Sequence, residues 1–101
     1  MDLLVNIFEH VRKIIIQVAK TRGIHDDNIL DKITAEPPKE EKYGDVSSNI
    51  ALLCSKSLNM NPRDLAESIG LLLKKNDYID EVKIAGPGFI NFHLDNSAYH
   101  S

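Results

Sequence analysis

The chain has 101 residues, of which 43% are hydrophobic and 27% charged, and this balance is typical of a folded domain and not of a disordered segment. Its 12 Lys and Arg against 15 Asp and Glu give a formal net charge of -3, which excludes the strongly basic surface that binds nucleic acid by charge alone. The single cysteine, Cys54, excludes an internal disulfide and a multi-cysteine metal site, so we expect a reducing, cytoplasmic location.

The first predicted element is an amphipathic helix from about residue 2 to residue 22. Apolar residues recur every third or fourth position from Leu3 to Ala19. Asp2 can cap the start of this helix, and Gly23 can take the left-handed conformation that ends it. Charged and amide side chains interrupt the apolar run at 11–19, so this run is neither a signal peptide nor a membrane span.

A short strand and an exposed loop are predicted next. Residues 24–31 are predicted to form a polar connection or a short helical turn. Ile33 and Ala35 alternate with polar neighbours, which predicts a strand over 32–36 that ends at the two following prolines. Residues 39–44 have mixed charge and no apolar period, so we expect an exposed, mobile loop there.

Two further helices are predicted to form a helical hairpin. The first starts at Asp45 as its N-cap and carries an apolar stripe of Val46, Ile50, Leu53, Cys54 and Leu58. Cys54 lies on that stripe and is expected to be buried and unreactive. The second helix starts with Asn61 as N-cap and Pro62 at its first position, and it buries a stripe that runs to residue 73.

The end of the chain predicts a β-hairpin whose two faces differ. Strands over 78–85 and 89–94 are joined by the turn Gly86-Pro87-Gly88. One face carries Val82, Ile84, Ile90, Phe92 and Leu94 and packs on the helices, while the other carries Lys83, Ala85, Phe89, Asn91 and His93. The fold class is therefore α+β: a small antiparallel sheet with about three helices packed on one face and the other face open, as one domain over residues 1–101.

The open face is the candidate site. The ring of Phe89, the amide of Asn91 and the imidazole of His93 suit stacking on a nucleic-acid base and hydrogen bonding to its edge. A surface aromatic on a sheet is more often covered by a neighbouring element, so both explanations stay open on the residues alone. The four histidines lack metal-ligand spacing, and the glycine-rich turn precedes a strand instead of a helix, so no metal site, catalytic site or phosphate loop is predicted.

Three blocks carry a resemblance to a known family. They are residues 44–51 (GDVSSNIA), 61–66 (NPRDLA) and 82–92 (VKIAGPGFINF). Their order and spacing resemble those of the additional N-terminal domain of bacterial-type arginyl-tRNA synthetases, over about residues 1–98. The resemblance implies an α+β module that precedes a class I catalytic domain and contacts the elbow of tRNA at its D-loop.

The resemblance also implies which side chains meet the tRNA. Phe89 and Asn91 would contact a D-loop base, with Ala85 and Gly86 beside them. Lys83 and His93 share that face and complete the predicted set of tRNA-binding residues, although we assign His93 no role from the family resemblance. The implied partners are tRNA(Arg) and the protein's own catalytic domain, which uses ATP with Mg; we expect no cofactor in this chain, no membrane contact and a monomer.

The sequence also departs from a complete synthetase. The His-Ile-Gly-His and Lys-Met-Ser-Lys signatures, the arginine pocket and the anticodon-binding domain are absent, so this chain is expected to be a non-catalytic fragment of arginine-tRNA ligase. A natural free-standing copy is the other possibility. A second functional class also stays open: a protein-interaction module whose open sheet face or first helix packs on a partner without RNA, which the negative net charge slightly favours.

Overall fold

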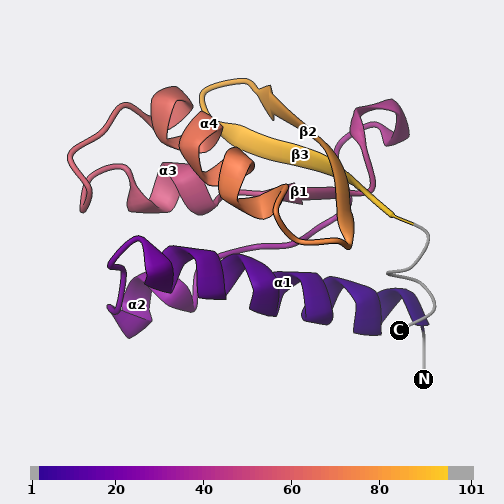
Figure 1. Cartoon of the computed structure of the whole chain (residues 1–101), viewed down its shortest axis with the longest axis horizontal. Helices are drawn as coiled ribbons and strands as arrows, with labels where there is room; N and C mark the ends of the chain where they lie inside the picture. The colour runs from indigo at the N-terminus through magenta and orange to yellow at the C-terminus, as the bar shows by residue number, and fades with distance from the viewer. Residues whose placement is uncertain (1–2, 96–101) are drawn as a thin grey trace.

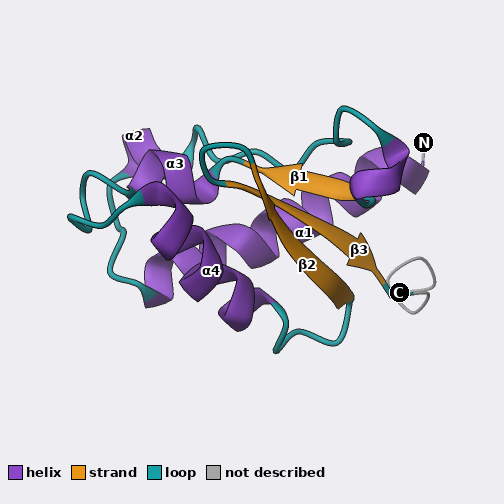
Figure 2. Ribbon diagram, turned by 90° about the horizontal axis from the view of Figure 1, so that it is seen from above, coloured by secondary structure: helices purple, strands orange, loops and turns teal. Residues whose placement is uncertain are grey.

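The protein was analysed as a computed structural model that describes residues 3–95, with side chains from residue 7 onward (Figures 1 and 2). Its elements in chain order are α1 (Leu3–Thr21), α2 (Asp27–Leu30), the 3-10 turn η1 (Glu41–Tyr43), β1 (Val46–Ser48), α3 (Ile50–Cys54), α4 (Pro62–Leu73), β2 (Ile79–Ala85) and β3 (Phe89–Leu94). None of these helices is long and apolar enough to cross a membrane.

The strands form one antiparallel sheet in the order β1-β3-β2, with β3 in the centre. The β2–β3 hairpin pairs Ile84 with Ile90 and Ala85 with Phe89 across the predicted turn, and β1 adds a pair between Val46 and Phe92. The register slips once, near the start of β2. The predicted α+β class and the hairpin are both confirmed.

The helices lie on one side of the sheet, as Figure 2 shows, and α1 runs along the lower edge of the molecule in Figure 1. Val46, Ile90 and Phe92 point to this side and are fully buried. They pack in one cluster with Val11 and Ile15 of α1 and with the apolar stripe of α4. Because every second residue of β3 points into this core, the residues between them must face the other way.

Local signals produce α1 and α4 where the sequence predicts them. The amide of Ile24 bonds the carbonyl of Ala19 at 3.0 Å around Gly23, which closes the C-terminus of α1. At the start of α4, the Asn61 side chain accepts a hydrogen bond from the amide of Arg63 at 2.9 Å. The predicted Asp2 cap lies outside the described residues.

The strand predicted over residues 32–36 is wrong. A single bridge, between Glu36 and Ser47, is all that this segment shares with the sheet. Its backbone groups are taken by side chains instead: Arg12 donates from Nε to the Ile33 carbonyl at 2.7 Å, and the Thr34 amide donates to Asn49 Oδ1 at 2.9 Å. Because the Ile33 carbonyl and the Thr34 amide are bonded to side chains, they cannot form the hydrogen bonds that pair one strand with another.

The helix predicted from Asp45 through Leu58 is also wrong at its start. Residues 46–48 form β1, and α3 is a short helix over Ile50–Cys54. Asp45 caps no helix, because its amide donates to the Phe92 carbonyl at 2.9 Å and its carboxylate accepts from the Leu94 amide at 2.8 Å. Cys54 is buried as predicted, and burial raises the pKa of its thiol.

A candidate nucleic-acid interface

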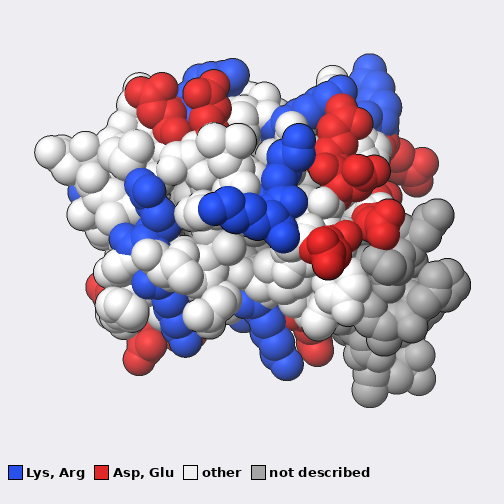
Figure 3. All heavy atoms as spheres, in the orientation of Figure 1, with Lys and Arg blue, Asp and Glu red and all other residues white. Residues whose placement is uncertain are grey.

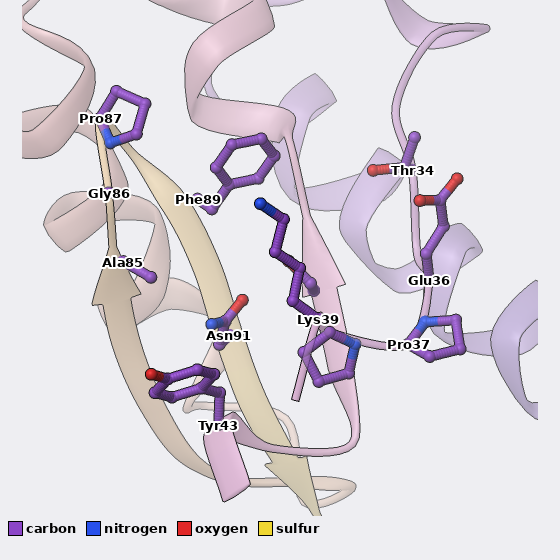
Figure 4. A pocket seen from close by; sticks show the side chains of 12 residues that line it. Thr34, Glu36, Pro37, Lys39, Tyr43, Ala85, Gly86, Pro87, Phe89 and Asn91 are labelled. Atoms are coloured by element: carbon purple, nitrogen blue, oxygen red, sulfur yellow. The ribbon is translucent and has the colours of Figure 1, made fainter. Parts of the chain in front are cut away.

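The sheet face opposite the helices carries a hollow of about 390 Å³ (Figure 4). Ala85, Gly86, Phe89 and Asn91 of the β2–β3 hairpin line one side of it, and side chains from the 34–43 segment line the other. The predicted open face is therefore partly walled, because the 34–43 segment bonds to the outer edge of β1 and stands beside the sheet. Apolar surface forms most of the hollow's lining.

Phe89 is the exposed aromatic of this site. It is the first residue of β3 and pairs with Ala85, whose side chain is a single methyl group. The residue is 40% exposed, and its ring stands at the rim of the hollow in Figure 4. An exposed phenyl ring fixed on a sheet can stack on a planar ligand with little loss of side-chain entropy.

Asn91 supplies the buried polar group of the hollow. It lies between Ser47 of β1 and Lys83 of β2 in the sheet register, and only 6% of its surface is exposed. Its Oδ1 atom is buried and has no hydrogen-bond donor within the described part of the chain. An oxygen left in this state costs about 1–3 kcal/mol. A ligand with an N–H or O–H group could remove that cost by donating to Asn91.

The turn before Phe89 is held against α4. A Cβ atom on Gly88 would lie 3.0 Å from the Cβ of Pro62, so a glycine is needed for the close approach. The Arg63 guanidinium donates to the carbonyl of Gly86. These contacts fix the position of the hairpin, and with it that of the Phe89 ring.

The predicted site residues fall into two groups. Phe89, Asn91, Ala85 and Gly86 come together in the hollow, whereas Lys83 and His93 share the sheet face without lining it. Lys83 is exposed, and its ammonium lies 3.3 Å from the carboxylate of Glu81. His93 lies near the C-terminal end of β3, and its Nδ1 atom is 3.9 Å from the Asp45 carboxylate.

Sequence reasoning missed the second wall of the hollow. Pro37, Pro38, Lys39 and Tyr43 line it, all from the stretch expected to be a strand end and an exposed loop. The exposure of Lys39 and Tyr43 is confirmed, but their segment lies beside Asn91 and is not an isolated loop. The one available signal was Tyr43, an aromatic residue in an otherwise charged loop.

The surface charge is mixed. On the face drawn in Figure 3, Lys and Arg side chains are interspersed with clusters of Asp and Glu, and no continuous basic surface forms there. Among the described residues, no group of three or more His, Cys, Asp or Glu side chains is placed to hold a metal ion. Any contact with nucleic acid would therefore depend on a few local groups.

Comparison with known proteins identifies the family. The sequence model described as "Arginyl tRNA synthetase N terminal domain" matches residues 6–94. This chain belongs to the arginyl-tRNA synthetase N-terminal domain family. The resemblance drawn from the three sequence blocks is thus confirmed.

Relatives of this arginyl-tRNA synthetase N-terminal domain include two arginine–tRNA ligases. The protein from Bartonella bacilliformis is 40% identical over 94 residues, and that from Listeria monocytogenes is 43% identical over 94 residues. Each alignment covers 92% of this chain and 16% of the relative, so the chain spans about a sixth of their length.

A solved structure shares the fold. The arginyl-tRNA synthetase of Thermus thermophilus superposes with a TM-score of 0.64 at 22% identity, over 89% of this chain and 14% of that one. The domain fold therefore persists where most side chains differ.

Proposed function

We propose that this domain binds tRNA(Arg) at the D-loop in the tRNA elbow and orients it for arginylation by the catalytic domain of an arginine–tRNA ligase in the cytoplasm. The domain itself takes no part in the chemistry. Membership of the arginyl-tRNA synthetase N-terminal domain family supports the choice of tRNA as the ligand. In this proposal Phe89 stacks on one base of the loop and Asn91 hydrogen-bonds its edge.

The observation that carries the proposal is the buried Oδ1 of Asn91, which has no hydrogen-bond partner among residues 3–95, next to the exposed residue Phe89. Each of the four bases offers an N–H donor on an edge and a flat face for stacking. A base unstacked from the D-loop could satisfy both groups at once. The apolar lining of the hollow would then exclude water from the new hydrogen bond.

The binding energy of this contact is enough to orient a tRNA that the rest of the ligase holds, but not enough to hold the tRNA by itself. Stacking contributes about 1–3 kcal/mol per base. The chain's net charge of -3 adds no general attraction to phosphate. We therefore expect the isolated domain to bind a D-arm hairpin weakly, with a dissociation constant on the order of 1 mM, which corresponds to about 4 kcal/mol.

The test is arginylation by a ligase that contains this domain, with Phe89→Ala and Asn91→Ala. We expect kcat/KM for tRNA to fall about 5- to 150-fold, the factor equivalent to a stacking loss of about 1–3 kcal/mol. Phe89→Tyr keeps the ring and should keep the rate. Thermal unfolding of each variant checks that the domain is folded. An unchanged kcat/KM in both alanine variants would overturn the proposal.

A second candidate function, docking of a protein surface without RNA contact, is favoured by Leu71. This residue of α4 is 69% exposed and borders a separate hollow with Val82 and Ile84. If docking is the function, Leu71→Ser should lower arginylation by the ligase while Phe89→Ala leaves it unchanged. The opposite pattern would support tRNA binding.

A further inference from the structure

We propose that the Pro37–Tyr43 segment is the second half of the nucleotide site, in which Tyr43 covers the base from the side opposite Phe89 and Lys39 pairs with the nucleotide's phosphate. This inference rests on the proposed function, because it concerns the same ligand in the same hollow. It assigns binding roles to two residues outside the β2–β3 hairpin.

The segment is fixed to the sheet at both ends. Glu36 and Ser47 exchange backbone hydrogen bonds of 3.0 and 2.6 Å, and Ser47 is the residue that pairs with Asn91 in the sheet. At the other end Gly44 packs on the backbone of Phe92, where an added Cβ would lie 2.7 Å from the carbonyl oxygen. These contacts at its two ends fix the position of the 37–43 segment relative to the Asn91 side chain.

Tyr43 is placed to contact a base. It is 44% exposed, lines the hollow and lies across the Asn91 amide from Phe89 in Figure 4. A base whose edge reaches Asn91 would thus have an aromatic ring on each side. The ammonium of Lys42 lies 5.3 Å from the centre of the Tyr43 ring, so this ring is already held by one neighbour.

Lys39 supplies a positive charge at the open side of the hollow, here called its mouth. Lys42 pairs with Glu40 at 3.2 Å and Lys83 with Glu81 at 3.3 Å, whereas no ion-pair partner of Lys39 is found in the described residues. Figure 4 shows its ammonium reaching across the hollow toward Phe89. A nucleotide that inserts its base beside Phe89 leaves its phosphate at this mouth, where an unpaired ammonium is attractive.

The acidic side chain in the hollow restricts the direction of entry. Glu36 lines the side farther from Phe89, as Figure 4 shows, and its carboxylate would repel a phosphate there. The phosphate is therefore expected on the Lys39 side of the mouth. A single nucleotide of a loop, inserted base first, meets all of these groups together.

The experiment is an amide-shift NMR titration of the 101-residue chain with a tRNA(Arg) D-arm hairpin. It compares the unmodified chain with Phe89→Ala, Tyr43→Ala, Tyr43→Phe, Lys39→Gln and the control Lys42→Gln. Tyr43→Ala should weaken binding at least about five-fold, the low end of one stacking contact, and Tyr43→Phe should not. Lys39→Gln should reduce the slope of log K against log salt by about 0.7–0.9, the value for one phosphate contact. Lys42→Gln removes the same charge from the same segment. Its ammonium contacts the Tyr43 ring, so the affinity can change in this variant, but the salt slope, which is the quantity compared, should stay unchanged.

The outcomes separate this inference from the proposed function. If Phe89→Ala abolishes the shifts while Tyr43→Ala and Lys39→Gln bind as the unmodified chain does, the second wall has no binding role and only this inference fails. If Lys39→Gln weakens binding without changing the salt slope, the phosphate assignment is wrong. If the unmodified chain shows no shifts with the hairpin, the proposed function fails together with this inference.

Discussion

Replacing Asn91 by leucine should make the domain more stable while abolishing its ligand binding. Leucine has the same branching as asparagine, and the side chain is buried against the apolar lining of the hollow. The change removes a buried oxygen that has no donor among the described residues. No other hydrogen bond of the described chain is lost with it, because none of those found involves the Asn91 side chain.

The magnitude follows from the cost of the unpaired oxygen. That cost is about 1–3 kcal/mol, and an apolar group of similar shape does not incur it. We expect the free energy of unfolding to rise by about 1–2 kcal/mol, after part of the gain is offset by imperfect packing of the new methyl groups. For a domain of this size each 1 kcal/mol raises Tm by about 4–8 °C.

The assay is urea and thermal unfolding of the 101-residue chain, followed by the D-arm titration of the same variant. Asn49→Leu is the matched control. The Asn49 amide accepts from the Thr34 amide at 2.9 Å and donates to the Lys32 carbonyl at 3.0 Å, so its loss should lower the free energy of unfolding by about 1–3 kcal/mol. The same substitution should thus have opposite effects at the two positions.

A fall in the stability of Asn91→Leu would refute this reasoning. It would mean that Oδ1 is satisfied in the free protein by an ordered water that leucine expels. A stabilised variant that still bound the hairpin would refute the functional half, because the amide would then have no part in recognition.

Three further predictions concern the scaffold. Gly44→Ala should lower the free energy of unfolding by about 3 kcal/mol or more, measured by urea titration, because φ at this residue is +136° and the new Cβ would meet the Phe92 carbonyl oxygen at 2.7 Å. Asn61→Ala should cost about 1 kcal/mol in the same assay, since it removes the N-cap of α4. Burial raises the pKa of the Cys54 thiol, so the folded state holds its proton at pH values where the unfolded state has lost it. Stability should therefore fall as pH rises from the unfolded-state thiol pKa through the raised folded-state pKa, and pH-dependent unfolding of Cys54→Ala should lack this fall.

Much of the fold could be predicted because its signals are local. The apolar period of α1 and the Asn61-Pro62 start of α4 each lie within one element. The turn at Gly86-Pro87-Gly88 joins adjacent strands, so the hairpin register follows from the turn and the period of two. Such features depend on neighbours in the sequence and need no knowledge of the rest of the chain.

The errors occurred where the partner is distant. Val46 and Ile50 are four apart and fit a helical stripe, yet Val46 pairs with Phe92 in the sheet. A strand of three residues is too short to show a period, so nothing in residues 46–48 distinguishes it from a helix start. Ile33 and Ala35 have the alternation of a strand, but Arg12 and Asn49 take the backbone groups of this stretch.

The sequence by itself determined the family, the two faces of the hairpin and the position of Phe89 and Asn91 on the same face. Alternation along a strand is a property of the backbone, so it can be read without a structure. Only the tertiary structure decided that Asn91 is buried and that Lys39 and Tyr43 stand opposite Phe89. Those facts depend on how the 34–43 segment bonds to β1 and on how β1 then pairs with β3. No local pattern of residues encodes the second of these contacts, because β1 and β3 are far apart in the chain.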